Sequence, residues 1–161
     1  MKKLLIFCFA VILLGGCKKD EPIKNVCNYL LQKGSADKSQ LLGKWDFAAF
    51  AYTADGIDIK NEIPITSCGF WDGTGSITIF SNGIDCTYNN RWSYKYSITN
   101  SNNITLTPCG IITMKGHVCH FEDEILIALD NAECFVVKNQ QLIIHYKEQN
   151  NRNILILNKN E

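Results

Sequence analysis

Cysteine sulfur is the group in this sequence with the widest choice of chemistry. The 161-residue chain has eight cysteines and three histidines. A cysteine can carry a lipid, pair in a disulfide or bind a metal ion. Cys17 lies between a short apolar run and the charged residues Lys18–Glu21. Its position at the junction of an apolar and a charged segment makes Cys17 the first of these residues to explain.

The residues before Cys17 have the three parts of a secretory signal peptide. Two lysines give a positive start, Leu4–Leu14 form the apolar run, and two glycines stand at the cleavage position. The apolar run is too short to cross a bilayer, because spanning takes about 20 residues. We therefore expect residues 1–16 to be a signal peptide that is removed on export.

The sequence Leu14-Gly15-Gly16-Cys17 resembles the lipobox of bacterial lipoproteins. The resemblance implies that the Cys17 sulfur receives a diacylglycerol, that cleavage follows Gly16, and that the new amine is acylated with a fatty acid such as palmitate. One acyl chain holds a protein to a membrane only weakly, so stable anchoring takes two or more. The expected partner is therefore a membrane, reached through the lipid anchor.

The charged residues that follow, Lys18–Glu21, resemble the export tag that Bacteroidota lipoproteins carry after the lipidated cysteine. The resemblance implies a lipid-anchored protein of the outer membrane that faces outward from the cell surface. The alternative is a solvated spacer that faces the periplasm, and charged residues keep a linker extended in both cases. We assign residues 17–39 as the lipidated N-terminus and linker.

Six further cysteines remain when Cys8 leaves with the signal peptide and Cys17 carries lipid. They are Cys27, Cys68, Cys86, Cys109, Cys119 and Cys134. An even number in an exported chain predicts disulfides, and the sequence cannot choose among the many pairings. We favour Cys109 with Cys119, which closes a short loop, whereas a helix expected between Cys119 and Cys134 would keep that pair apart. Free buried thiols are the alternative.

A zinc site is the competing hypothesis for some of these residues. The candidate ligands are Cys109, His117, Cys119 and His120. They lack the C-x2-C spacing with which two thiolates of one turn hold zinc. On a strand, His117 and Cys119 would share one face and His120 would point to the other. We therefore predict no metal site and no cofactor.

Charge and length limit the class of protein. The chain has 16 basic and 16 acidic residues, and loss of the two signal-peptide lysines leaves a small acidic excess. No basic block or basic-aromatic stripe remains, so nucleic acid is not an expected partner. Residues 40–161 have the length of a single domain with one hydrophobic core.

The body of the chain has the pattern of short β-strands. Apolar and polar residues alternate over Arg91–Thr99, and the pair Asn82-Gly83 after a strand that begins at Ser76 predicts a tight turn, because both residues tolerate positive φ. Further strands are predicted at Trp45–Tyr52, Ile104–Thr107, Ile111–Met114, Phe135–Lys138, Leu142–Tyr146 and Ile154–Leu157. Many short strands divided by Asn and Gly turns predict an antiparallel barrel or a strongly curved sheet.

One segment has helical periodicity instead. It places five apolar residues on one face, namely Phe121, Ile125, Ala128, Leu129 and Ala132. Glu122–Glu124 fill the first turn, where acidic side chains meet the exposed amide groups of a helix start. Acids in that position are more often dipole partners in water than an acid–base pair. No Gly-x-Ser-x-Gly motif is present either, so we assign no catalytic residue.

Residues 40–161 resemble the META domain, also called the HslJ-like domain, of bacterial envelope lipoproteins. The opening Leu41–Trp45 resembles the family's Leu-x-Gly-x-Trp, and Glu122–Leu129 resembles its Glu-x-x-Phe-Leu-x-Ala-Leu helix. Other similar stretches are Cys86–Asn89, Thr113–Met114 with Cys119, Phe135–Asn139 and Leu142–Ile144.

The resemblance implies a mainly β (α+β) fold, in which a curved antiparallel β-sheet or small barrel is wrapped around one α-helix. It supplies no catalytic residue. The chain departs from the family at Asp85 and Asn139, where the family has glycine, and at residues 115–118, which lengthen the path to Cys119. Asn suits position 139 if the turn there needs a left-handed backbone.

We expect a non-catalytic envelope protein rather than an enzyme, with a role as a binding or stress-protection module and with a protein or small ligand as partner. The alternative is a peptidase inhibitor that presents a rigid loop to a protease. The long stretch 56–75 is the candidate loop, because exposed Phe70 and Trp71 would make good anchors in a partner's groove. A structural role for both residues, closing one end of the barrel, is the other interpretation.

Overall fold

The computed structural model describes residue 27 and residues 34–53, 60–66, 75–88, 90–100, 102–112, 121–148 and 151–160. In these residues the fold is mainly β, as predicted. The elements are α2 (Lys38–Leu41), β1 (Gly43–Thr53), β2 (Lys60–Pro64), β3 (Ser76–Ile79), β4 (Ile84–Thr87), β5 (Arg91–Thr99), β6 (Asn103–Ile112), α3 (Glu122–Asp130), β7 (Ala132–Lys138), β8 (Gln141–Glu148) and β9 (Asn151–Lys159). No helix in this part of the chain is long and apolar enough to span a membrane.

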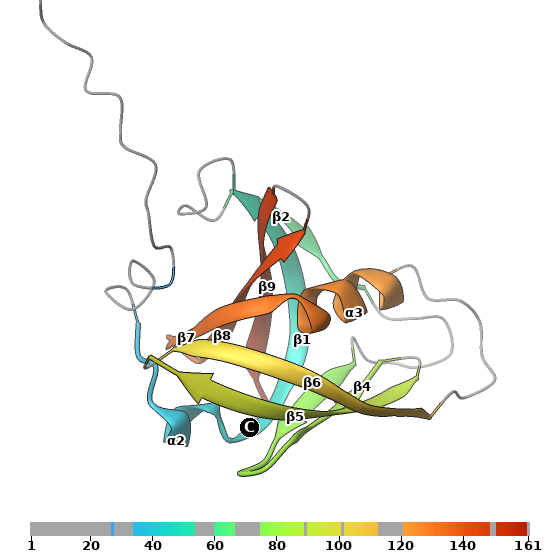
Figure 1. The fold of residues 1–161 in the computed structure, drawn as a ribbon. Coiled ribbons are helices and arrows are strands. Elements are labelled where there is room, and N and C mark those ends of the chain that lie inside the picture. The colour runs from blue at the N-terminus through green and yellow to red at the C-terminus, as the bar shows by residue number, and fades with distance from the viewer. Residues whose placement is uncertain are drawn as a thin grey trace, which may run out of the picture.

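Eight of the strands close into an antiparallel barrel (Figure 1). From β3 to β9 each strand pairs with the next in sequence, and β9 then pairs with β1 over Trp45–Thr53. The other edge of β1 pairs first with β3 and, from Ala49 onward, with β2. The long strand β1 is therefore the element that joins the two ends of the sheet.

A bulge in β1 changes which residues of this strand point into the barrel. The register between β1 and β9 shifts between Phe47 and Ala49. Trp45, Phe47 and Phe50 consequently all belong to the main core inside the barrel, although strict alternation would have turned Phe50 outward. Ala49 and Ala51 face the other side of the wall.

A second apolar cluster lies on the outer face of β1, β7, β8 and β9, and we call it the outer cluster. Its buried members are Ala49, Ala51, Cys134, Val136, Ile143, Ile154 and Ile156. Cys27 packs against this cluster and forms a disulfide with Cys134. Part of the segment that we had assigned as a linker is thus covalently attached to the barrel.

Helix α3 forms where the periodicity predicted it, and Ile125, Ala128 and Leu129 are buried in the main core. Its position corrects the expectation that the sheet would wrap around it. Among the described residues, β6 and β7 share one registered pair, Asn103 with Cys134. Because β7 begins only at Ala132, α3 lies beside β6 in the place that a longer β7 would have taken (Figure 1). The helix therefore completes the barrel wall.

Two turns test the predicted use of left-handed residues. The β3–β4 loop is closed by a hydrogen bond in which the Phe80 amide donates to the Gly83 carbonyl at 2.8 Å, yet neither Asn82 nor Gly83 has positive φ, so the predicted mechanism was wrong. The β7–β8 turn does contain left-handed residues, because Asn139 and Gln140 have φ of 50° and 62°. A two-residue hairpin with both residues left-handed matches the twist of the strands that it joins.

Replacing Gln140 with glycine should raise the free energy of unfolding by about 0.5–1 kcal/mol. A left-handed backbone costs a residue such as glutamine roughly 1–2 kcal/mol, and glycine avoids this cost. Part of the gain in stability is lost again, because glycine has more conformational freedom in the unfolded chain. Urea unfolding followed by circular dichroism measures the change. Ser81→Gly is the matched control, since Ser81 is a loop residue without positive φ. An equal gain from both substitutions would contradict the explanation.

Candidate functional site

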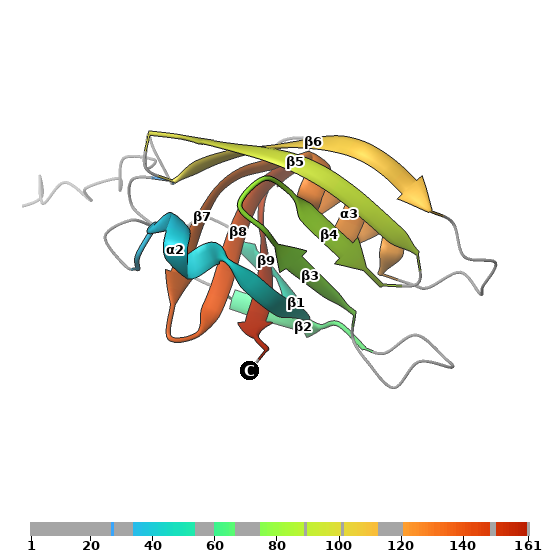
Figure 2. The ribbon, with the colours of Figure 1, turned by 90° about the horizontal axis from the view of Figure 1, so that it is seen from below.

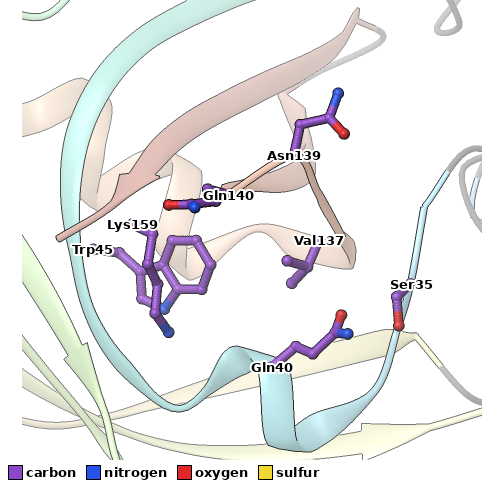
Figure 3. Close-up of a pocket in the computed structure, with 7 residues that line it drawn as sticks. All are labelled: Ser35, Gln40, Trp45, Val137, Asn139, Gln140 and Lys159. Carbon is purple, nitrogen blue, oxygen red and sulfur yellow. The ribbon is translucent and has the colours of Figure 1, made fainter. Parts of the chain in front are cut away.

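The structure has a pocket of about 570 Å³. Its lining comes from residues on or next to α2, the β7–β8 turn and the ends of β1 and β9, and Figure 2 shows where these elements lie. Its lining residues are Ser35, Gln40, Trp45, Val137, Asn139, Gln140 and Lys159 (Figure 3). Backbone hydrogen bonds join the separate parts of the chain that supply them. The amides of Ser35 and Val137 each donate to the other's carbonyl, at 2.8 and 2.7 Å. The Lys159 amide donates to the backbone carbonyl of Gln140 at 2.8 Å.

Trp45 and Lys159 form the most strongly fixed part of the pocket. The Trp45 side chain is buried, and its indole Nε1 donates to the Leu41 carbonyl at 2.7 Å. The Lys159 Nζ lies 4.3 Å from the centroid of the Trp45 ring and donates to the Leu42 carbonyl at 2.5 Å. Figure 3 shows the lysine side chain beside the ring. The ring face and the carbonyl hold the ammonium group in place through cation–π attraction and a charge-assisted hydrogen bond.

Neutral polar side chains line other parts of the pocket. Asn139 and Gln140 are exposed on the left-handed turn, and Gln40 is exposed on α2. The short helix α2 is fixed at its start because the Ser39 amide donates to the Asp37 carboxylate at 2.9 Å. Among the described residues, those that line the pocket include three amides, a hydroxyl and one ammonium, but no carboxylate. The arrangement can bind a small polar molecule and favours one with negative charge.

The buried thiol of Cys86 is not a nucleophile in this fold. Cys86 lies in the main core, and burial, followed by the charge of Glu122, raises the pKa of its thiol well above the ordinary value. A thiol attacks as the thiolate, so Cys86 stays protonated and inert at neutral pH.

Iodoacetamide should modify Cys109 in the native protein and leave Cys86 unmodified. Cys109 is a free thiol on the surface, whereas Cys86 is free but buried with a raised pKa. Peptide mass spectrometry after brief alkylation at pH 8 measures both sites, and alkylation in denaturant is the control in which both should react. Equal labelling of the two cysteines in the native protein would show that Cys86 is accessible.

Of the site residues singled out from the sequence, Cys109 is described, and it is not among the residues that line the pocket. The Cys109 thiol is free in this structure and donates weakly to the Thr107 carbonyl at 3.6 Å. Cys119 lies outside the described residues, and its pairing with Cys109 stays a prediction. Cys17, Phe70 and Trp71 also lie outside them.

The proposed metal ligands His117, Cys119 and His120 likewise lie outside the part of the chain that the structure describes. Within that part, no three His, Cys, Asp or Glu side chains are grouped so that they could hold a metal ion. The disulfide seen between described residues, Cys27 with Cys134, was one of the pairings that the sequence left open.

Sequence reasoning missed the pocket as a unit. Two of its residues carried a signal: Trp45 belongs to the motif that opens the first strand, and Asn139 stands at a predicted turn. Ser35 and Lys159 carried none, because they reach the pocket only through the pairing of Ser35 with Val137 and of β9 with β1.

No protein-family model matches the chain, and no curated protein matches it either. A solved structure does match: the crystal structure, at 1.00 Å resolution, of a DUF4847 family protein from Bacteroides vulgatus ATCC 8482. It is 13% identical, has a TM-score of 0.52 and covers 74% of this chain and 94% of that chain. At this identity the likeness concerns the fold alone and supports the mainly β barrel. The resemblance of residues 40–161 to the META/HslJ-like domain stays a prediction.

Proposed function

We propose that this protein is a non-catalytic, lipid-anchored module of the bacterial outer membrane that binds a small anionic ligand in the Lys159 pocket. The observation that carries the proposal is the pocket's charge: Lys159 supplies an ammonium group, and the other polar lining residues in the described part of the chain are neutral. A carboxylate or phosphate would form a charge-assisted hydrogen bond with Lys159, and the amides and hydroxyl would orient the rest of the ligand.

The envelope location rests on the first residues of the chain and on the disulfide. A signal-peptide pattern precedes Cys17, and disulfides such as Cys27–Cys134 persist mainly in oxidising compartments outside the cytoplasm. The charged residues after Cys17 favour display at the cell surface, and a periplasm-facing domain is the second choice. The membrane is then a partner through the lipid, and the pocket is free for a soluble ligand.

The ligand proposal is tested by isothermal titration of the purified protein. Glucuronate, N-acetylneuraminate and glycerol phosphate are the anionic probes, and glucose is the neutral one. We expect at least one anionic probe to bind and glucose not to bind. Lys159→Met keeps an apolar stem on Trp45 and should weaken binding about tenfold or more, whereas Lys159→Arg should retain most of it. If no anionic probe binds, or if Lys159→Met binds as tightly as the wild type, the pocket is not an anion site.

The anchor is tested separately by growing the source cells with an alkyne-tagged palmitate. We expect the wild-type protein and the matched control Cys109→Ala to carry the label, and Cys17→Ala to lose it. Protease treatment of intact cells then distinguishes the two orientations, because only a surface-facing domain is digested. Label that persists in Cys17→Ala would place the acyl group elsewhere.

Peptidase inhibition remains the alternative function, carried by Phe70 and Trp71 in the predicted loop. A panel of serine, cysteine and metallopeptidases tests it. Inhibition that is lost in the Phe70→Ala, Trp71→Ala double variant, with folding unchanged, would favour the inhibitor over the ligand-binding module.

A further inference from the structure

The join between β6 and β7 is the weakest in the described barrel. Their registered pairing is the single pair Asn103–Cys134, and one additional hydrogen bond runs from the Phe135 amide to the Asn102 carbonyl at 3.1 Å. Every other pair of neighbouring barrel strands shares at least four registered pairs. On one side of Cys134 the gap is filled by α3. On the other side, the free edge of β7 is covered by residues from before β1.

Gly34 and Ser35 cover that edge, and we call these two residues the strap. Ser35 forms a two-hydrogen-bond bridge with Val137 of β7. Gly34 approaches β7 so closely that a Cβ atom there would lie 2.8 Å from the Val137 carbonyl oxygen and would collide with the Val136 side chain. The strap therefore fits β7 because position 34 has no side chain, and it extends the sheet at the point where β6 has diverged.

The disulfide fixes the chain just before the strap. Cys27 is bonded to Cys134 in the same strand, β7, and its carbonyl accepts a hydrogen bond from the buried Asn102 Nδ2 at 2.8 Å. After the strap, the chain is fixed again at Leu41, which is buried in the main core. The strap is thus held from both directions. Without the disulfide the strap has no covalent link to β7, and a segment held there by noncovalent contacts opens more readily, as chain termini do when they fray.

We propose that the Cys27–Cys134 disulfide is a redox-controlled clasp for the ligand pocket. When the disulfide is closed, the strap stays on β7 and Ser35 forms one wall of the pocket. When it is reduced, the strap leaves β7, the pocket loses that wall, and ligand affinity falls. This inference rests on the proposed function for its effect on ligand, but the movement of the strap is independent of any ligand.

The chemical step is thiol–disulfide exchange with a dithiol, such as dithiothreitol or a reduced dithiol protein of the envelope. One thiolate of the dithiol attacks the Cys27 sulfur, which is the more exposed of the pair, since Cys134 is fully buried. The sulfur–sulfur bond breaks and Cys134 leaves as a thiolate that takes up a proton. The second thiolate of the dithiol then displaces Cys27 from the mixed disulfide. The protein gains two thiols and the dithiol becomes a disulfide.

Hydrogen exchange of the full chain, measured with and without dithiothreitol, tests the clasp. We expect the amide hydrogens of Ser35 and Val137 to exchange at least tenfold faster after reduction, while those of the β8–β9 ladder change little. The Cys27→Ala, Cys134→Ala double variant should exchange like the reduced protein even when no reductant is present. Cys109→Ala is the matched control and should behave like the oxidised wild type.

Four outcomes would decide between the parts of the proposal. Unchanged exchange at Ser35 and Val137 would overturn the clasp, and so would equal acceleration throughout the barrel, because reduction would then unfold the domain instead of releasing the strap. Faster exchange at the strap with a binding constant for the anionic probe at least tenfold weaker would support the whole inference. Faster exchange at the strap in a protein that binds no probe in either redox state would uphold the release of the strap and overturn the proposed function.

Discussion

Trp45→Ala should lower the free energy of unfolding by about 3–5 kcal/mol, the range for a large aromatic residue removed from a core. The Trp45 side chain is 1% exposed and packs in the main core. Its loss also leaves the Leu41 carbonyl without the indole donor and removes the ring beneath the Lys159 ammonium. A whole domain is stable by about 5–15 kcal/mol, so this variant should unfold at a much lower urea concentration.

Trp45→Phe is the matched control for this prediction. Phenylalanine keeps an aromatic ring in the core but cannot donate to Leu41, so we expect a loss of about 1–3 kcal/mol, clearly smaller than that of the alanine variant. Equilibrium urea unfolding followed by far-ultraviolet circular dichroism measures both. A loss below about 1 kcal/mol in Trp45→Ala would mean that the ring does not fill the barrel as described.

Removal of the Cys27–Cys134 disulfide should cost about 2–5 kcal/mol of stability. The two cysteines are 107 residues apart in the sequence, so the bond restricts most of the unfolded chain. Restriction of the unfolded state grows with the length of the closed loop, which puts this disulfide near the upper end of the range. The double variant Cys27→Ala, Cys134→Ala avoids leaving a polar group in the outer cluster.

Unfolding in guanidinium chloride without reductant measures the effect of the disulfide, with Cys109→Ala as the matched surface control. We expect the control to stay within about 0.5 kcal/mol of the wild type. Wild-type protein should also lose stability when dithiothreitol is added, and the double variant should not respond to it. If oxidised and reduced wild-type proteins unfold at the same denaturant concentration, the bond does not stabilise the fold.

The strands were predictable where one face is buried and the other is wet. Arg91–Thr99 alternates in sequence, and β5 has the same bounds, with Trp92 and Tyr94 buried and Arg91 and Lys95 exposed. β2 was missed because Lys60–Pro64 lacks such alternation and exists as a strand through its pairing with the edge of β1. β4 was missed because it is short. The Asn82-Gly83 turn before it was predicted, but the strand that follows that turn was not.

Closure of the barrel and the position of α3 depend on contacts between distant segments, which a local sequence pattern does not predict. The face of α3 was predicted correctly at Ile125, Ala128 and Leu129, which recur with helical spacing. The other two predicted members lie outside the helix, because Phe121 precedes its first turn and Ala132 begins β7. Its place in the wall follows from the late start of β7, which is a property of pairing between distant segments. The pocket depends on the same long-range pairings, since Ser35 and Lys159 meet around the Asn139 turn only after the barrel has closed.

The position of the disulfide also limits how far the barrel can lie from a lipid attached at Cys17. If Cys17 is the anchor, the first attachment to the domain among the described residues is Cys27, and the stretch between the two spans at most about 35 Å when fully extended. The barrel would then stay close to the lipid headgroups. Opening the bond and releasing Ser35 would roughly double that reach, so reduction would let the barrel sample space much farther from the bilayer.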